Sequence, residues 1–263
     1  QVHHPAVALC SASPLLLLGL AVGGPGVSPG EAVVKAAYAK YAGKWPTSFT
    51  YLQKTVLPDG RKETWYHAVK LPGLLRIDVA PDITGRAILY RNDSLYSYGA
   101  KQMKTRSWWP NSFLVLTGDL HVAPPAETIK RLRAFGFNLD ITHEESVKGV
   151  KYIVVGAKQG DLRSKQFWLE KERMIVMRLI EPNGADPSRP MEAQFTKYTR
   201  LGGGWIEGFV LITLGGQPTQ VEERYEIKNN AKIDPAIFLP GPYRLPAWVG
   251  SLADVYGTPT RIR

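Results

Sequence analysis

The sequence predicts a mainly β (α+β) protein whose strongly curved antiparallel sheet carries helices across its concave face. Short apolar and aromatic stretches recur between turns rich in Gly, Pro, Asn and Asp, which is typical of consecutive antiparallel strands. Roughly ten strands in one sheet must curl strongly or close. A single segment, residues 107–137, interrupts the strands with aromatic and helical sequence, and we expect it to lie across the concave face.

The first predicted element is a helix over residues 31–42, where apolar residues recur at helical spacing and Gly43 follows to end it. The clearest strand signal comes next. Pro58-Asp59-Gly60 forms a turn between two long strands, and Pro72-Gly73 leads into a third. Strands are predicted in this part of the chain over residues 48–57, 62–71, 74–80, 86–91 and 94–99.

The interrupting segment contains a second predicted helix, which Pro124-Pro125 opens and Gly136 ends. The strands then resume, over residues 138–146, 151–157, 165–170, 174–181, 191–200, 205–214 and 219–228. A helical turn is predicted over residues 234–238. Residues 239–263 are rich in Pro and Gly and form a C-terminal tail without periodicity.

The third predicted strand indicates how the sheet is sided. Leu75, Ile77 and Val79 share one face, whereas Arg76 and Asp78 share the other. This alternation predicts a sheet with one dry face and one solvent-exposed face.

Composition describes one globular domain of 263 residues without a linker or an internal repeat. The formal net charge is +10, which is compatible with nucleic acid, anionic lipid head groups or an acidic partner. The basic residues are spread along the strands rather than clustered, so we favour a solvated surface and expect no nucleic-acid partner.

Residues 1–30 are predicted to be a signal peptide, because residues 14–24 form an apolar run of suitable length followed by small residues. The alternative is an apolar tail, since no Lys or Arg precedes the run. Cys10 is the single cysteine and lies in this leader, so the mature chain would contain no disulfide and no cysteine nucleophile.

No catalytic or metal-binding motif accompanies the strands. His67, His121 and His143 lack metal-ligand spacing, and nucleophile-elbow, phosphate-loop and dinucleotide motifs are absent from the sequence. We therefore expect a binding protein without metal or cofactor, and not an enzyme. The enzymatic alternative is a lipid hydrolase, which requires a nucleophile such as Ser94 or Ser97 to lie near His67 or another base.

Several stretches resemble the LolA family of periplasmic carriers that move lipoproteins toward the outer membrane. They are Tyr-Leu-Gln-Lys-Thr-Val at residues 51–56, residues 69–78 around Leu-Pro-Gly, Asn-Asp-Ser-Leu-Tyr-Ser-Tyr at residues 92–98, residues 167–172 and the turn at residues 234–238. The resemblance covers residues 31–238. It implies an unclosed half-barrel with an apolar cavity for acyl chains, a periplasmic monomer, a lipid or lipidated-protein cargo, and membrane donor and acceptor proteins.

On this basis we nominate two sets of residues, although ordinary core packing is the alternative for each of them. The candidate cavity wall comprises Trp65, Leu75, Ile77, Val79, Tyr96, Phe167 and Leu169. The candidate lid comprises Phe113, Leu116, Ile129 and Leu132.

The sequence departs from the resembled family at one position that matters for the family's mechanism. In carriers of that family an arginine that takes part in lid closure precedes the proline entering the third strand, and here that position is Leu71. The family's lid-locking mechanism therefore does not transfer. A regulatory module that senses an envelope signal and docks on a membrane protein remains an alternative on the same scaffold.

Overall fold

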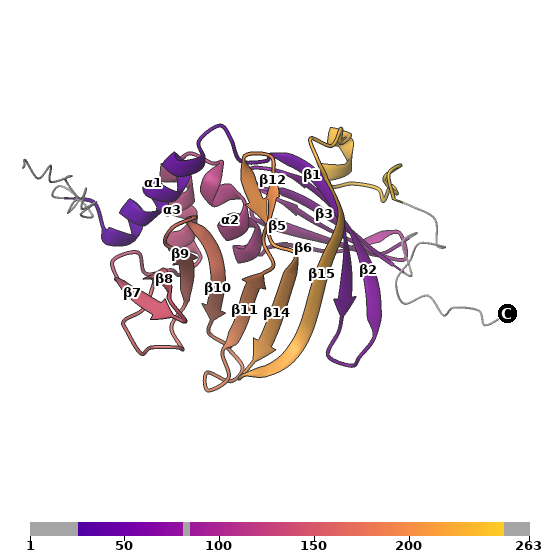
Figure 1. The fold of residues 1–263 in the computed structure, drawn as a ribbon. Helices are drawn as coiled ribbons and strands as arrows, with labels where there is room; N and C mark the ends of the chain where they lie inside the picture. Colours follow the sequence, from indigo (N-terminus) through magenta and orange to yellow (C-terminus); the bar gives the residue numbers. More distant parts are fainter. Residues whose placement is uncertain (1–25, 81–84, 250–263) are drawn as a thin grey trace, which may run out of the picture.

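The computed structural model describes residues 26–80 and 85–249, and Figure 1 shows their arrangement. The predicted leader, with Cys10, falls mostly on residues 1–25 and so lies outside the described residues. The last part of the predicted tail, residues 250–263, lies outside them as well.

Thirteen strands of the described chain form one antiparallel sheet in the order β6-β5-β4-β3-β2-β1-β15-β14-β11-β10-β9-β8-β7. The first arm of this sheet comprises β1 (Ser48–Val56), β2 (Lys62–Lys70), β3 (Leu74–Ala80), β4 (Ala87–Arg91), β5 (Ser94–Gly99) and β6 (Gln102–Trp108). The second arm comprises β7 (Thr142–Val147), β8 (Val150–Val155), β9 (Gln166–Glu170), β10 (Ile175–Glu181), β11 (Met191–Thr196), β14 (Phe209–Leu214) and β15 (Gln217–Asn229).

The two arms meet at β1, which pairs with β2 on one side and with β15 on the other. The long strand β15 thus returns the end of the domain to its beginning. Strands β6 and β7 are the two ends of the strand order, so the sheet is open. The sheet curves strongly and has helices on its concave side (Figure 1), which confirms the predicted half-barrel.

The helices are α1 (Pro29–Tyr41), α2 (Ser112–Thr117), η1 (Asp119–His121), α3 (Pro125–Ala134) and η2 (Pro235–Phe238). Side-chain oxygens of Ser28 and Asn111 cap the first turns of α1 and α2, and Pro125 opens α3. The first four of these elements pack on strands β8–β11 and β14. Their shared core includes Val34, Leu116, Leu132, Leu139, Val155, Phe167, Leu169, Phe195 and Val210.

Two parts of the sheet differ from the prediction. Strand β6 was missed because most of its residues are polar and exposed, as is common for an edge strand. The two strands predicted over residues 191–200 and 205–214 are each interrupted, which creates a separate hairpin of β12 (Thr199–Leu201) and β13 (Gly204–Ile206). The chain leaves the sheet at Lys197, where φ is +53°, and Gly208 closes the loop by donating to Lys197 O at 3.1 Å.

The predicted solvent-exposed face of β3 was wrong. Arg76 and Asp78 form a buried ion pair, with 2.9 Å between Arg76 Nε and Asp78 Oδ2. Arg76 also donates to the carbonyls of Ile237 and Arg244, at 3.1 and 2.5 Å. Residues 233–249 therefore cover the convex face of the first arm, and both faces of β3 are buried.

Candidate ligand-binding cavity

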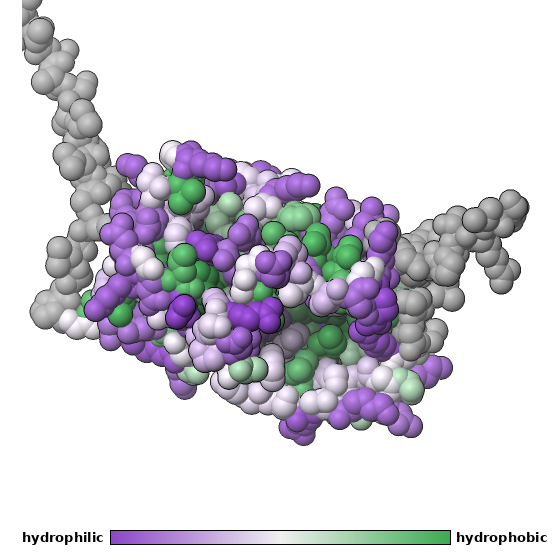
Figure 2. Space-filling model, turned by 90° about the horizontal axis from the view of Figure 1, so that it is seen from below, coloured by the Kyte–Doolittle hydropathy of each residue, from purple (hydrophilic) through white to green (hydrophobic). Residues whose placement is uncertain are grey.

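A cavity of about 320 Å³ lies on the concave face between the first arm, α2 and the β12–β13 hairpin. This volume is within the usual range for small-molecule sites. Figure 2 shows a hollow in which hydrophobic side chains gather, with hydrophilic side chains around it. The residues that line the cavity from the sheet side include Phe49, Tyr51, Gln53, Trp65, His67, Val69, Leu71, Leu75, Ile77, Ile88, Tyr90, Ile212, Gln220, Glu222 and Arg224.

The wall of the cavity is apolar and rich in aromatic rings. It is built by strand parity, because alternate residues of β1, β2 and β3 point to the concave side. Trp205 from the hairpin and Phe113 and Leu114 from α2 close it from the other side. An apolar wall of this kind suits an alkyl chain, which needs hydrophobic contacts and no hydrogen-bond partners.

One side of the cavity, where β1 and β15 pair, is polar and charged. We call it the polar floor and define it as Gln53, His67, Glu207, Glu222 and Arg224. Arg224 Nη1 lies 2.6 Å from a carboxylate oxygen of Glu207, and both side chains are at least nine-tenths buried. Burial acts to lower the pKa of Arg224, but the neighbouring Glu207 carboxylate raises it overall. Burial also raises the pKa of Glu222.

His67 is the central residue of the polar floor. Its ring stacks on Tyr51 with 4.4 Å between centroids, and the Arg224 guanidinium lies 4.6 Å from the centroid of the same tyrosine. Burial and the Arg224 charge hold the pKa of His67 well below its usual range. The imidazole is therefore neutral at pH 7, and each of its nitrogens offers one donor or one acceptor.

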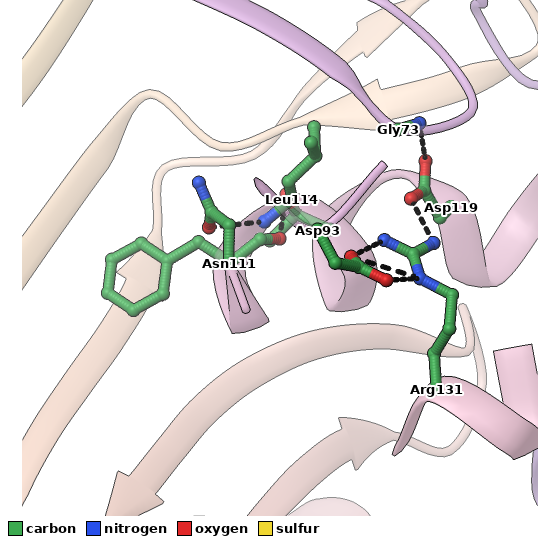
Figure 3. Close-up of polar contacts among 8 residues, drawn as sticks. Gly73, Asp93, Asn111, Leu114, Asp119 and Arg131 are labelled. Atoms are coloured by element: carbon green, nitrogen blue, oxygen red, sulfur yellow. Dashed lines mark hydrogen bonds and ion pairs between the residues drawn. The ribbon is translucent and has the colours of Figure 1, made fainter. Parts of the chain in front are cut away.

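Helix α2 lies over the cavity, and the neighbouring elements η1 and α3 are fastened to the sheet by a polar network that Figure 3 shows. We call α2, η1 and α3 the helical cover. Arg131 on α3 donates to both carboxylate oxygens of Asp93, in the β4–β5 turn, at 2.5–3.2 Å and to Asp119 on η1 at 2.6 Å. Asp119 also accepts from Gly73 N in the β2–β3 turn at 2.9 Å. One guanidinium thus joins the cover to two turns at the ends of the strands.

Leu71 supplements this network with an apolar contact. It is buried, lines the cavity and packs on Gly118 between α2 and η1, where a Cβ would lie 2.8 Å from a Leu71 methyl carbon. The position that carries an arginine in the resembled carriers therefore holds the cover by packing. The polar contact to the cover comes from the same turn, through Gly73 N and Asp119.

Several solved structures have a similar architecture. A domain from Vibrio parahaemolyticus described as an outer membrane lipoprotein-sorting protein superposes with a TM-score of 0.52 and 13% identity, covering 79% of this chain and 95% of its own. A LolA superfamily protein from Nitrosomonas europaea gives 0.51 and 11%, with 81% and 99% covered. The chain has the LolA-like fold. A DUF1329 family protein from Desulfovibrio piger has the same fold, with a TM-score of 0.53, 15% identity and coverage of 81% and 98%.

No family model and no curated protein matches the sequence. The likeness to LolA-like structures, at 11–15% identity, therefore lies in the fold.

Four of the nominated residues line the cavity of this LolA-like fold: Trp65, Leu75 and Ile77 on the wall and Phe113 on the cover. Val79 belongs to the apolar cluster around the cavity without lining it. These four residues therefore remain the candidates for ligand contact among those nominated.

The other nominated residues lie elsewhere. Tyr96 points to the convex face, where it packs with Leu89 and Phe238. Phe167, Leu169, Leu116 and Leu132 are fully buried in the core between the helices and the second arm, and Ile129 packs against that core. The helices pack directly on β8–β10 there, so these residues belong to the core and not to the lining of the described cavity.

Sequence reasoning named His67 only as a possible catalytic base, and it missed the other four residues of the polar floor and the aromatic residues Trp45, Phe49 and Tyr51 of the wall. The signal for Phe49, Tyr51 and Gln53 is their shared parity on β1. No local pattern indicates Arg224 and Glu222, because they reach the cavity only through the pairing of β15 with β1, which joins residues far apart in the chain.

Neither Ser94 nor Ser97 on β5 lies within hydrogen-bond reach of His67 on β2, the base that the hydrolase alternative names. The sheet register sets Ser97, Ile88, Ile77 and His67 side by side on β5, β4, β3 and β2. Three interstrand spacings amount to about 14 Å, which is far beyond hydrogen-bond reach. Across residues 26–80 and 85–249 there is also no group of three or more His, Cys, Asp or Glu side chains arranged to hold a metal.

Proposed function

We propose that this protein is a periplasmic carrier that binds the acyl chains of a lipoprotein or lipid in its concave cavity for transport toward the outer membrane. The observation that carries the proposal is the apolar cavity of about 320 Å³ beneath a helical cover. The LolA-like fold supports it, because a neighbour with this fold is described as an outer membrane lipoprotein-sorting protein. Within the described part of the chain, no helix has the length and apolarity to span a membrane.

Burial of hydrocarbon supplies enough free energy for such a role without chemistry. Each buried methylene contributes about 0.8 kcal/mol, so ten methylenes would contribute about 8 kcal/mol before the costs of ordering. This gross figure sets an upper limit on the affinity in the micromolar range. A carrier needs binding of this order, because a cargo held much more tightly would not be released.

Tryptophan fluorescence gives a direct test. Four of the seven tryptophans line the cavity: Trp45, Trp65, Trp109 and Trp205. A fatty acid brominated along its chain should quench their fluorescence saturably, and native mass spectrometry of protein purified from the periplasm should show a bound acyl lipid.

The matched variants are two tryptophan insertions. Ile88→Trp fills the cavity from β4 and should abolish quenching by the brominated chain, whereas Val150→Trp on the exposed surface of β8 should not. Unsaturable quenching, or equal quenching in the two variants, would reject the cavity as the lipid site.

A second candidate function is an envelope-sensing module that docks on a membrane protein. It is favoured by Trp108 and Trp109, which are each 60% exposed at the end of the edge strand β6. Exposed neighbouring indoles are unusual on a monomer without a partner. Retention of this protein by solubilised envelope proteins, lost in Trp108→Ser without loss of lipid binding, would favour docking over carriage.

A further inference from the structure

Three side chains of the polar floor have unused hydrogen-bonding capacity. Both ring nitrogens of His67 lack a hydrogen-bond partner among the described residues. Gln53 donates to Thr55 at 3.0 Å through its amide nitrogen, but its Oε1 has no partner within the same residues, and neither has Arg224 Nε. Gln53 and His67 are 0% and 5% exposed. Buried polar atoms are rarely left unpaired, so this group indicates a molecule that pairs with them.

The unpaired atoms come from three neighbouring strands and face the same space. Gln53 on β1 lies opposite Arg224 on β15, and Tyr51, two residues before Gln53, lies opposite His67 on β2. Adjacent strands are about 4.8 Å apart and residues two apart on a strand about 6.7 Å, so His67 and Arg224 start about 12 Å apart, with Gln53 between them. A polar group of a few heavy atoms can bridge such a span, which suits a lipid head rather than a polymer.

The charges of the floor select against an anion. One guanidinium, that of Arg224, is paired with Glu207 at 2.6 Å and lies near Glu222 as well. Gln220 donates to Glu222 at 2.6 Å, which further occupies the carboxyl group. With two carboxyl groups for one guanidinium and a neutral imidazole, the floor carries no surplus positive charge. A phosphate or carboxylate would therefore find no free cation here.

We propose that the polar floor binds the uncharged, hydroxyl-bearing head of an acyl lipid, of which a monoacylglycerol is the simplest example. The head hydroxyls pair with His67 and Gln53 Oε1, and Arg224 Nε donates to a hydroxyl or ester oxygen. The acyl chain then lies along the apolar wall formed by Trp65 and Ile77. This inference rests on the proposed lipid carriage and adds the chemical class of the head.

The test compares three ligands with one acyl chain on the full chain of the protein: monooleoylglycerol, methyl oleate and oleate. Displacement of a brominated fatty acid gives each dissociation constant. Monooleoylglycerol should bind roughly tenfold or more tightly than methyl oleate, since two hydroxyl groups gain partners, and more tightly than oleate. His67→Phe and Gln53→Leu should each weaken monooleoylglycerol binding by about three- to tenfold and leave methyl oleate unchanged.

The controls make the same substitutions elsewhere in the sheet. His143→Phe on β7 and Gln194→Leu on β11 lie outside the cavity and should change neither affinity. The urea midpoint of ligand-free His67→Phe should equal or exceed that of wild type, because no hydrogen bond is lost.

The possible outcomes separate the two proposals. Equal affinity for the three ligands, tighter oleate binding, or variants that change nothing would overturn the head site and leave lipid carriage standing. Binding of none of them would overturn the carrier proposal itself. If His67→Phe fails to fold, Gln53→Leu and the wild-type ligand series still decide the question.

Discussion

Replacement of Arg131 by Met should destabilise the protein strongly, because it leaves a buried carboxylate without its cation. Asp119 is fully buried, and burial raises its pKa while Arg131 lowers it. Once Arg131 is removed, the Asp119 carboxylate keeps one hydrogen bond, from Gly73 N. Breaking one side of a buried ion pair typically costs 3–5 kcal/mol. The arginine itself is about one-fifth exposed, so we expect about 3 kcal/mol.

The measurement is urea unfolding followed by tryptophan fluorescence and circular dichroism. Arg133→Met is the matched control on the same helix, because Arg133 pairs with Glu31 and Asp140 on the exposed surface and its loss should change little. Arg131→Lys keeps the charge but loses the two-pronged contact with Asp93, so it should fall between wild type and Arg131→Met.

A double-mutant cycle decides whether the mechanism is the stranded carboxylate. Asp119→Asn combined with Arg131→Met should cost less than the sum of the single changes, with a coupling of about 0.5–3 kcal/mol. The same variants should also exchange bound lipid faster, since the helical cover is then released from the β2–β3 and β4–β5 turns. A loss below about 1 kcal/mol for Arg131→Met, or additive single changes, would refute the role assigned to this network.

Three other predictions concern the packing near the cavity and on the convex face of the first arm. Burial lowers the pKa of His121 to about 4, although its hydrogen bond to Met174 O acts to raise it. Because the unfolded chain binds this proton more readily, the stability of the fold above pH 6.5 should fall as the pH is lowered toward 4. His121→Gln should remove up to about 3 kcal/mol of that loss between pH 6.5 and 4, measured by urea unfolding at each pH. Gly118→Ala should cost about 1–3 kcal/mol, because its Cβ would clash with Leu71, and Leu71→Ala should relieve it; additive losses in the double variant would contradict this. Trp248→Ala should cost about 2 kcal/mol by uncovering the convex face while lipid affinity stays constant, and a loss of lipid affinity would show that the two faces are coupled.

The positions of the first-arm strands were predictable because short sequence signals mark the turns between them. Pro58-Asp59-Gly60 and Asn92-Asp93 each sit between apolar stretches, and the strands appear where these turns place them. Strand β6 carries no such apolar signal, since it is an exposed edge with residues such as Lys104 and Arg106. Local pattern thus identified strands that have a dry face and missed the strand that has none.

The side of the sheet on which each residue lies could not be read from alternation, because both faces of the first arm are covered. In β1 and β3 no position is exposed and most are buried, so polar and apolar residues no longer mark inside and outside. Tyr96 was placed on the cavity wall for this reason, although its partner Leu89 lies on the convex face. Arg76 and Asp78 were read as solvent-exposed on the same assumption, whereas residues 233–249 bury them.

The polar floor was hidden by distance along the chain. Gln53 and Arg224 become neighbours through the β1–β15 pairing, which joins the first and last strands of the sheet. Each looks unremarkable in its own strand, and their chemistry arises from the contact between them. A sequence pattern with a range of a few residues cannot report such a pair.

The covering of the convex face also explains how a cavity can persist on the concave one. An unfilled space in a core costs stability, since its lining loses packing partners. In the second arm the helices fill the concave face directly. In the first arm, the segment around Tyr243 and Trp248 supplies a separate core on the outside of β2–β5. Because those strands are anchored from the outside, their inner face does not have to be packed for the sheet to hold, and it remains available for a ligand.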